Sequence, residues 1–237
     1  VQSSAGAGRV GVFMETTDLE VAPGSSTMAT VVILNQGPVV DHFKVSVLGV
    51  PADWVPGAPP PIRLMPGTQQ DVMLTIQPMR SPESKAGSHP VTVQVASQDL
   101  PDQVSSVQAT VKVGSYSQFR SEMHPQKVRA GDMAQVDVYN EGNSQETVTV
   151  SCQDRGNEVA FQPPEAKLSV PPGEVAAAGF YAAPHERRWF GGSVGYNFTA
   201  RVASAGGETQ RHEGEVVSRA MFPVWLLPLL LLMCLCL

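Results

Sequence analysis

The chain has 237 residues, of which 42% are hydrophobic and 16% are charged, and it contains 20 prolines and 21 glycines. Because proline and glycine interrupt helices, this composition favours an all-β protein with many turns, and the length suits two sandwich domains of roughly 100 residues each. The net charge of −6 argues against a nucleic acid partner, which would need a clustered basic surface.

The N-terminal half of the chain has the pattern of a β-sandwich preceded by a short extension. Residues 1–9 are assigned to the extension and residues 10–113 to the first domain. Apolar and polar residues alternate with the period of two that a half-buried strand requires. The predicted strands of this domain are Thr27–Leu34, Lys44–Val47, Asp71–Ile76, Val91–Val95 and Ser106–Val113.

A second domain follows, because the sequence repeats itself at a nearly constant offset. Asn35 and Asn140 each begin an Asn-x-Gly turn, and they are 105 residues apart (140 − 35). Pro66 and Pro172 of two Pro-Gly turns are 106 residues apart (172 − 66). The sequence Val-Ala-Ser also recurs, at 95–97 and at 202–204. Three landmarks at the spacing of one sandwich domain predict a tandem repeat.

The second domain is assigned to residues 116–217, with the boundary near residues 114–115. The pair Gly206-Gly207 is interpreted as a hairpin turn, since glycine adopts positive φ without steric cost. The clearest predicted strands of this domain are Gln135–Tyr139, Glu146–Val150 and Asn197–Val202.

The turn motifs of the first domain resemble a known family. A Pro-Gly turn, a β run ending in Asn-x-Gly, the segments 41–47 and 50–55, the turn 64–67 and the sequence 86–91 follow one another in an order that resembles bacterial and archaeal NEW3-type Ig-like surface repeats. The second copy is less similar, because it has no Pro-x-x-Trp element. The resemblance implies an immunoglobulin-like fold and a cell-surface location, and it supplies no catalytic residues.

The sequence offers no constellation for catalysis or for a cofactor. The five histidines are scattered without metal-ligand spacing, and neither a nucleophile elbow nor a phosphate-binding loop is present. Cys152 is the only cysteine outside the C-terminal apolar run, so no disulfide framework is expected in the domains. We therefore expect a protein that is not an enzyme and that has no catalytic residue, no bound metal and no cofactor.

Two aromatic elements are candidate contact sites. Trp54 is either a packed core residue or a platform on which a sugar ring stacks. The loop that contains Arg187, Arg188, Trp189 and Phe190 combines the residue types enriched at protein interfaces. The alternative for this loop is that Trp189 and Phe190 close the end of the second domain.

The C-terminal residues 221–237 contain no charged residue. A helix of this length would be about 26 Å long, which is at the short end of what crosses a bilayer core. Trp225 suits a membrane interface, and Pro228 would kink such a helix. The expected fold class is therefore all-β, with two tandem immunoglobulin-like β-sandwiches followed by one C-terminal transmembrane helix.

Together these features predict a single-pass, membrane-anchored surface protein with extracytoplasmic domains. The expected partners are the membrane lipid bilayer and other membrane-protein subunits or envelope components, which the Ig-like domains would contact. One form of this hypothesis makes the chain an accessory subunit of a membrane complex. The alternative function is a carbohydrate-binding surface module that depends on Trp54.

Overall fold

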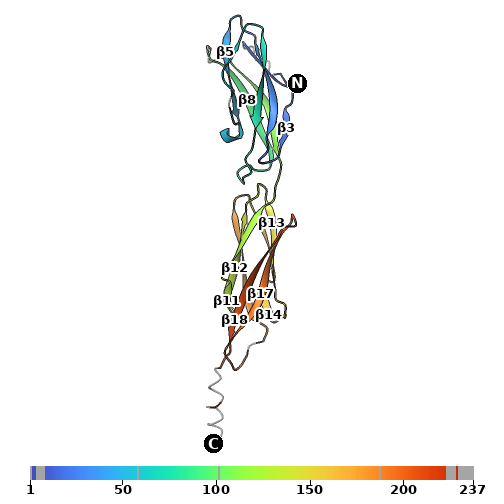
Figure 1. Ribbon diagram of the computed structural model, residues 1–237, viewed down its shortest axis with the longest axis vertical. Coiled ribbons are helices and arrows are strands. Elements are labelled where there is room, and N and C mark those ends of the chain that lie inside the picture. Colours follow the sequence, from blue (N-terminus) through green and yellow to red (C-terminus); the bar gives the residue numbers. More distant parts are fainter. Residues whose placement is uncertain are drawn as a thin grey trace. The chain divides into compact units, whose positions relative to one another are not determined.

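The computed structural model describes residues 2–3, 9–57, 59–100, 102–186, 188–222 and 228. The chain divides into two compact units, residues 1–116 and residues 117–237, and each has its own hydrophobic core. We call them domain 1 and domain 2 (Figure 1). Both are all-β, as the alternation of apolar and polar residues along the sequence predicts.

Domain 1 is a sandwich of two sheets. The first sheet has the order β1-β2-β4-β7 and the second has the order β3-β9-β8-β5-β6. All neighbours are antiparallel except β3 and β9, which are parallel. The strands are β1 (Gln2–Ser3), β2 (Val10–Met14), β3 (Asp18–Val21), β4 (Thr27–Asn35), β5 (Asp41–Leu48), β6 (Ile62–Leu64), β7 (Gln69–Ile76), β8 (Gly87–Ser97) and β9 (Val104–Val113), with one 3-10 turn, η1 (Ala52–Trp54).

Domain 2 repeats this plan, with the strand β14 at the edge where domain 1 has η1. Its sheets have the orders β10-β12-β16-β14 and β11-β18-β17-β13-β15, and β11 is parallel to β18. The strands are β10 (Phe119–His124), β11 (Lys127–Arg129), β12 (Met133–Asn140), β13 (Glu146–Gln153), β14 (Val159–Gln162), β15 (Glu165–Val170), β16 (Val175–Pro184), β17 (Ser193–Ser204) and β18 (Thr209–Arg219). Two mainly antiparallel sheets packed face to face, with these crossovers, define an immunoglobulin-like β-sandwich.

The predicted Asn-x-Gly turns are corners built around a buried asparagine. Asn35 donates from Nδ2 to the carbonyl oxygens of Val39 (2.9 Å) and Leu64 (3.0 Å), and its Oδ1 accepts from the backbone nitrogen of Gly37 (2.9 Å). In domain 2, Asn140 makes the corresponding bonds to Ser144, Val170 and Gly142. The side chain therefore ties three chain segments together, because a buried amide must satisfy its donors and its acceptor.

The hairpin predicted at Gly206-Gly207 is confirmed, since β17 and β18 pair antiparallel on either side of this turn. Gly207 has φ of 92°, and its nitrogen donates to the carbonyl of Ser204. A side chain at this φ would be strained, so glycine is the suitable residue.

The predicted fold class needs one correction, which concerns the C-terminal helix. Within the part of the chain that the structure describes, no helix is both long enough and apolar enough to cross a membrane. Of residues 223–237, only Pro228 is described, and it has helical geometry. Trp225 lies outside the described residues. The fold class that the described residues support is therefore two tandem β-sandwiches.

Candidate interaction surfaces

Trp54 lies in the core of domain 1 and has no accessible ring face. Only 3% of its surface is exposed, and its ring packs edge-on against His89, with 5.2 Å between the ring centroids. Its carbonyl accepts a hydrogen bond of 2.7 Å from the nitrogen of Gln77, just after β7. A sugar needs an open ring face to stack on. The position of Trp54 therefore corrects its interpretation as a ligand contact.

The aromatic loop of domain 2 is exposed instead. Trp189 is 65% exposed, and Phe190 is also exposed. The loop is held by the segment after β18, since Met221 and Phe222 donate backbone hydrogen bonds to the carbonyls of Arg188 (3.1 Å) and Trp189 (2.8 Å). We call Trp189, Phe190, Met221 and Phe222 the aromatic cluster.

The geometry of the aromatic cluster is fixed by two further contacts. The rings of Phe190 and Phe222 are 5.6 Å apart, and the nitrogen of Gly191 donates to the carbonyl of Phe222 (3.2 Å). Arg188 is exposed beside the cluster, and Arg187 lies outside the described residues. The alternative in which Trp189 and Phe190 close the end of the domain does not match their exposure. Exposed aromatic side chains on an ordered loop are a feature of protein interfaces.

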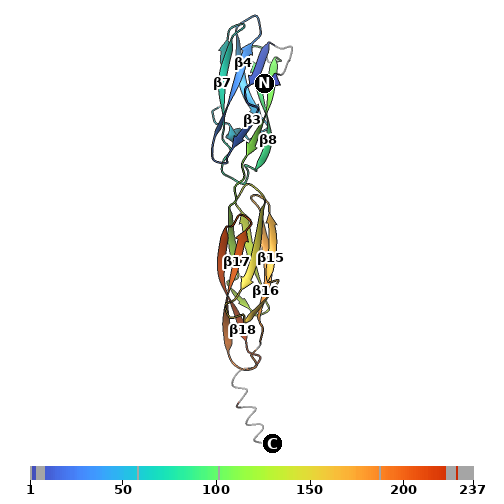
Figure 2. The ribbon, with the colours of Figure 1, turned by 90° about the vertical axis from the view of Figure 1, so that its right-hand side faces the viewer.

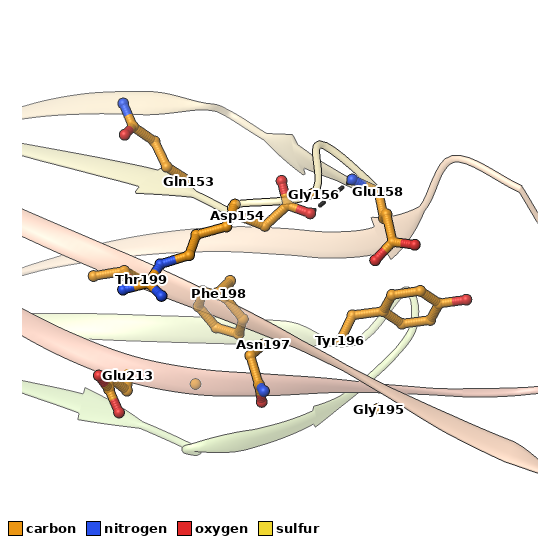
Figure 3. A pocket seen from close by; sticks show the side chains of 12 residues that line it. Gln153, Asp154, Gly156, Glu158, Gly195, Tyr196, Asn197, Phe198, Thr199 and Glu213 are labelled. Carbon is orange, nitrogen blue, oxygen red and sulfur yellow. Dashed lines mark hydrogen bonds between the residues drawn. The ribbon is translucent and has the colours of Figure 1, made fainter.

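A polar hollow of about 540 Å³ lies on domain 2 between the β13–β14 loop and strands β17 and β18 (Figure 3). Asp154 orders that loop, because its Oδ2 accepts from the nitrogens of Glu158 (2.7 Å) and Val159 (3.2 Å). The side chains of Glu158 and Tyr196 lie on the same side of the hollow (Figure 3). Both residues also line a neighbouring hollow of about 460 Å³.

The hollow does not assemble a reactive group or a metal site. Throughout the described residues, no cluster of three or more His, Cys, Asp or Glu side chains could hold a metal ion.

Domain 2 does contain a Ser–His contact, of 2.8 Å between Ser121 Oγ and His212 Nε2. Ser121 Oγ donates its proton to Gln210 Oε1 (2.7 Å), so the histidine donates to Ser121 rather than accepting from it. This arrangement does not activate a nucleophile, which would need the opposite proton direction.

Two titratable groups of domain 2 are perturbed by burial. Desolvation lowers the pKa of His212, while the nearby Glu122 carboxylate acts in the opposite direction. Desolvation raises the pKa of the buried Cys152 thiol to about 12, so it stays protonated and unreactive near neutral pH.

One feature that the motif analysis did not single out is the open edge of β7. This strand pairs with β4 on one side only, and it forms the edge of its sheet (Figure 2). Met73 of β7 is 72% exposed, and Met28 of β4 is 67% exposed. In two strands of alternating apolar and polar residues, a methionine stands at a position that should face solvent. This pattern was the signal in the sequence that could have revealed the surface.

Comparison with known proteins adds little to this description. No family model matches the chain, and no curated protein matches it. A crystal structure of a protein of unknown function from Porphyromonas gingivalis W83 is 12% identical, with a TM-score of 0.32, and the match covers 88% of this chain and 99% of that chain. The ASH/PapD-like domain 7 of human CEP192 is 15% identical, with a TM-score of 0.31, and the match covers 44% of this chain and 84% of that domain. Both similarities are too low to support an argument, so the immunoglobulin-like description rests on the strand topology.

Proposed function

We propose that this chain is a non-enzymatic interaction protein whose immunoglobulin-like domains bind other proteins at a membrane or cell envelope. The observation that carries the proposal is the aromatic cluster of domain 2. Trp189 is 65% exposed on a loop that backbone hydrogen bonds hold in place. A rigid, exposed aromatic side chain supplies a large contact area at a small cost in conformational entropy, which is why such residues dominate binding hot spots.

The sequence around the cluster supports a site close to a membrane or to an apolar partner. Met221 and Phe222 begin the uncharged run that extends to Leu237. The aromatic cluster is thus the place where a folded domain meets the most apolar sequence of the chain. Arg188 beside it adds a donor of the kind that binds carboxylate and phosphate groups.

A photo-crosslinking amino acid at position 189 tests the proposal in membranes of the source cells. We expect one crosslinked product of discrete mass, because a specific partner covers the cluster. The matched control is position 181, where Tyr181 is 52% exposed on β16, outside the cluster. Equal crosslinking from both positions, or none from position 189, would contradict a binding role for the loop.

A second measurement examines the apolar sequence alone. We expect the full chain to sediment with membranes after alkaline carbonate washing, and a chain that ends at Phe222 to remain in the supernatant. Identical behaviour of the two chains would rule out membrane association through residues 223–237.

The carbohydrate-binding alternative loses its main support, because it depended on Trp54 as a stacking platform. No second aromatic platform for a sugar was predicted from the sequence.

A further inference from the structure

The open side of β7 carries backbone hydrogen-bonding groups that no described strand uses. Thr68 accepts a hydrogen bond from Asn35 at the end of β4, whereas Gln77 donates to Trp54 of η1 on the other side, so the even-numbered residues of β7 direct their backbone groups toward β4. Backbone direction alternates along a strand. The N–H and C=O groups of the odd-numbered residues therefore point away from β4, and these residues are Gln69, Asp71, Met73 and Thr75.

Domain 2 shows what kind of element fits this edge. There, β14 pairs antiparallel with the second half of β16, with Gln162 opposite Tyr181 and Ala160 opposite Ala183. By the offset that relates Pro172 to Pro66, Tyr181 corresponds to Thr75. In domain 1, η1 replaces β14 and supplies one bond, from Gln77 to Trp54, so Thr75 lacks the strand that its counterpart Tyr181 has. The residues before Thr75 and their counterparts before Tyr181 have no described strand on this side in either domain, so the open stretch of β7 reaches further along the strand than that of β16.

The edge also lacks most of the features that keep an edge strand from pairing. Natural proteins protect edges with proline, with several charges, with bulges or with a covering element. Strand β7 contains no proline, and Asp71 is its one charged residue. Its outward side chains Met73 and Thr75 continue across the sheet to Thr30 and Met28 of β4. This face is therefore partly apolar up to the rim.

We propose that β7 pairs antiparallel with β7 of a second copy of this chain, joining the two four-stranded sheets of domain 1 into one sheet. The two-fold register centred on Met73 places Met73 opposite its own copy and Asp71 opposite Thr75 of the other copy. The apolar side chains then meet, and the Asp71 carboxylate faces a hydroxyl that donates a hydrogen bond to it.

Two neighbouring registers are less favourable. Centring the pair on Asp71 opposes two carboxylates, and like charges directly opposite each other destabilise a strand pair. Centring it on Val72 places the Asp71 carboxylate opposite Met73, where no donor is available. Of these three registers, the one centred on Met73 gives the Asp71 carboxylate a donor and places no like charges opposite each other.

Disulfide trapping tests both the dimer and its register. In the full chain with Cys234 and Cys236 replaced by serine, we expect Met73→Cys to form a covalent dimer under mild oxidation, because opposite residues of such a pair have Cα atoms about 5.5 Å apart. The matched control is Met28→Cys, which is similarly exposed but would lie about 20 Å from its copy, three strand spacings across the sheet and about four residues along it. Cys152 is buried and does not compete.

The outcome overturns the proposal if Met73→Cys gives no dimer, or if the two variants crosslink at the same rate. A second variant, Met73→Pro, removes an N–H that points away from β4, so it leaves the β4–β7 ladder in place. We expect it to halve the mass measured by light scattering in detergent while circular dichroism and the melting temperature show a folded protein. An unchanged mass for the folded variant, or a monomeric parent chain, would also overturn the proposal.

Discussion

The two domains share one corner and differ at one edge. Both use a buried asparagine, Asn35 or Asn140, to connect the same three chain segments. At the edge of the shorter sheet, however, domain 1 has η1 and the buried Trp54, whereas domain 2 has β14 and the partly buried Phe161. The comparison indicates that the corner specifies the fold and that the edge is free to vary, so the edge is where the two domains can acquire different partners.

The outward faces of the two shorter sheets also differ between the domains. In domain 2, the strand β10 carries Arg120, which lies 4.1 Å from the centre of the Tyr139 ring and contacts the carboxylates of Glu122 and Glu141. The corresponding region of domain 1 contains Phe13 opposite Val32 instead. At this position one face is therefore charged and the other apolar, although the strands β2-β4-β7 and β10-β12-β16 follow one another in the same way.

The largest effect is expected for Trp54→Ala. Removing a buried Trp should destabilise domain 1 by about 4 kcal/mol, because the transfer and cavity terms add. The matched change Phe161→Ala should cost domain 2 about 2 kcal/mol, since Phe161 is partly exposed. Urea unfolding followed by circular dichroism measures both changes. Equal losses in the free energy of unfolding would mean that η1 and β14 stabilise the edge equally, which would contradict the difference between the two domains.

Asn35→Ala and Asn140→Ala should have equal effects, of about 3 kcal/mol each, because each substitution removes the three hydrogen bonds of a buried side chain, worth about 1 kcal/mol apiece. Native-state alkylation of Cys152 reports the unfolding of domain 2, since the thiol is buried until the domain opens. Asn140→Ala should therefore accelerate the alkylation and Asn35→Ala should not. Acceleration by Asn35→Ala would show that the two domains unfold together.

The smallest effect is the dependence on pH that His212 should give to the stability of domain 2. The pKa of His212 is lowered from 6.5 in the folded state, so the neutral ring is favoured by folding. Its contribution to stability is present above pH 6.5 and is lost as the pH falls through the lower folded value. His212→Gln should flatten the acid side of the stability curve of domain 2. A curve that the substitution leaves unchanged would exclude His212 as the cause.

The stability of domain 2 at alkaline pH provides a control, because it depends on Cys152 and not on His212. Burial raises the pKa of Cys152 from 9.0 to about 12, so its contribution is present below pH 9.0 and is lost as the pH rises toward 12. Cys152→Ser leaves the acid side as it is, and it should reduce the loss of stability above pH 9.0.

Strands with a clear alternation could be predicted from the sequence, and those without it could not. Residues Thr27–Leu34 were predicted and β4 is Thr27–Asn35, because every second side chain from Ala29 to Asn35 is buried. Strand β18 was missed, since its first half is polar and its inward position 214 is a glycine. Phe198 lies across from Gly214 and fills that space, where an added Cβ would clash with the Phe198 ring.

The candidate sites were harder to predict, because exposure depends on contacts between distant segments. The composition of the loop around Trp189 indicated an interface, but its exposure follows from backbone bonds to Met221 and Phe222, which lie beyond two further strands of the chain. The burial of Trp54 depends on its bond to Gln77 and its packing on His89 in the same way. Local sequence describes which side chain is present, and long-range pairing decides whether solvent reaches it.

The asparagine corner also offers a route to engineering. Asn35 binds the carbonyl of Val39, so the intervening residues form a closed loop with both ends fixed by a single side chain. Gln36 and Pro38 of this loop are exposed, whereas the corresponding loop of domain 2 contains the buried Asn143. Replacement of Gln36 and Pro38 by foreign residues, with Gly37 kept between them, should leave the sandwich folded. The corner of domain 1 is therefore a natural point for displaying short peptides.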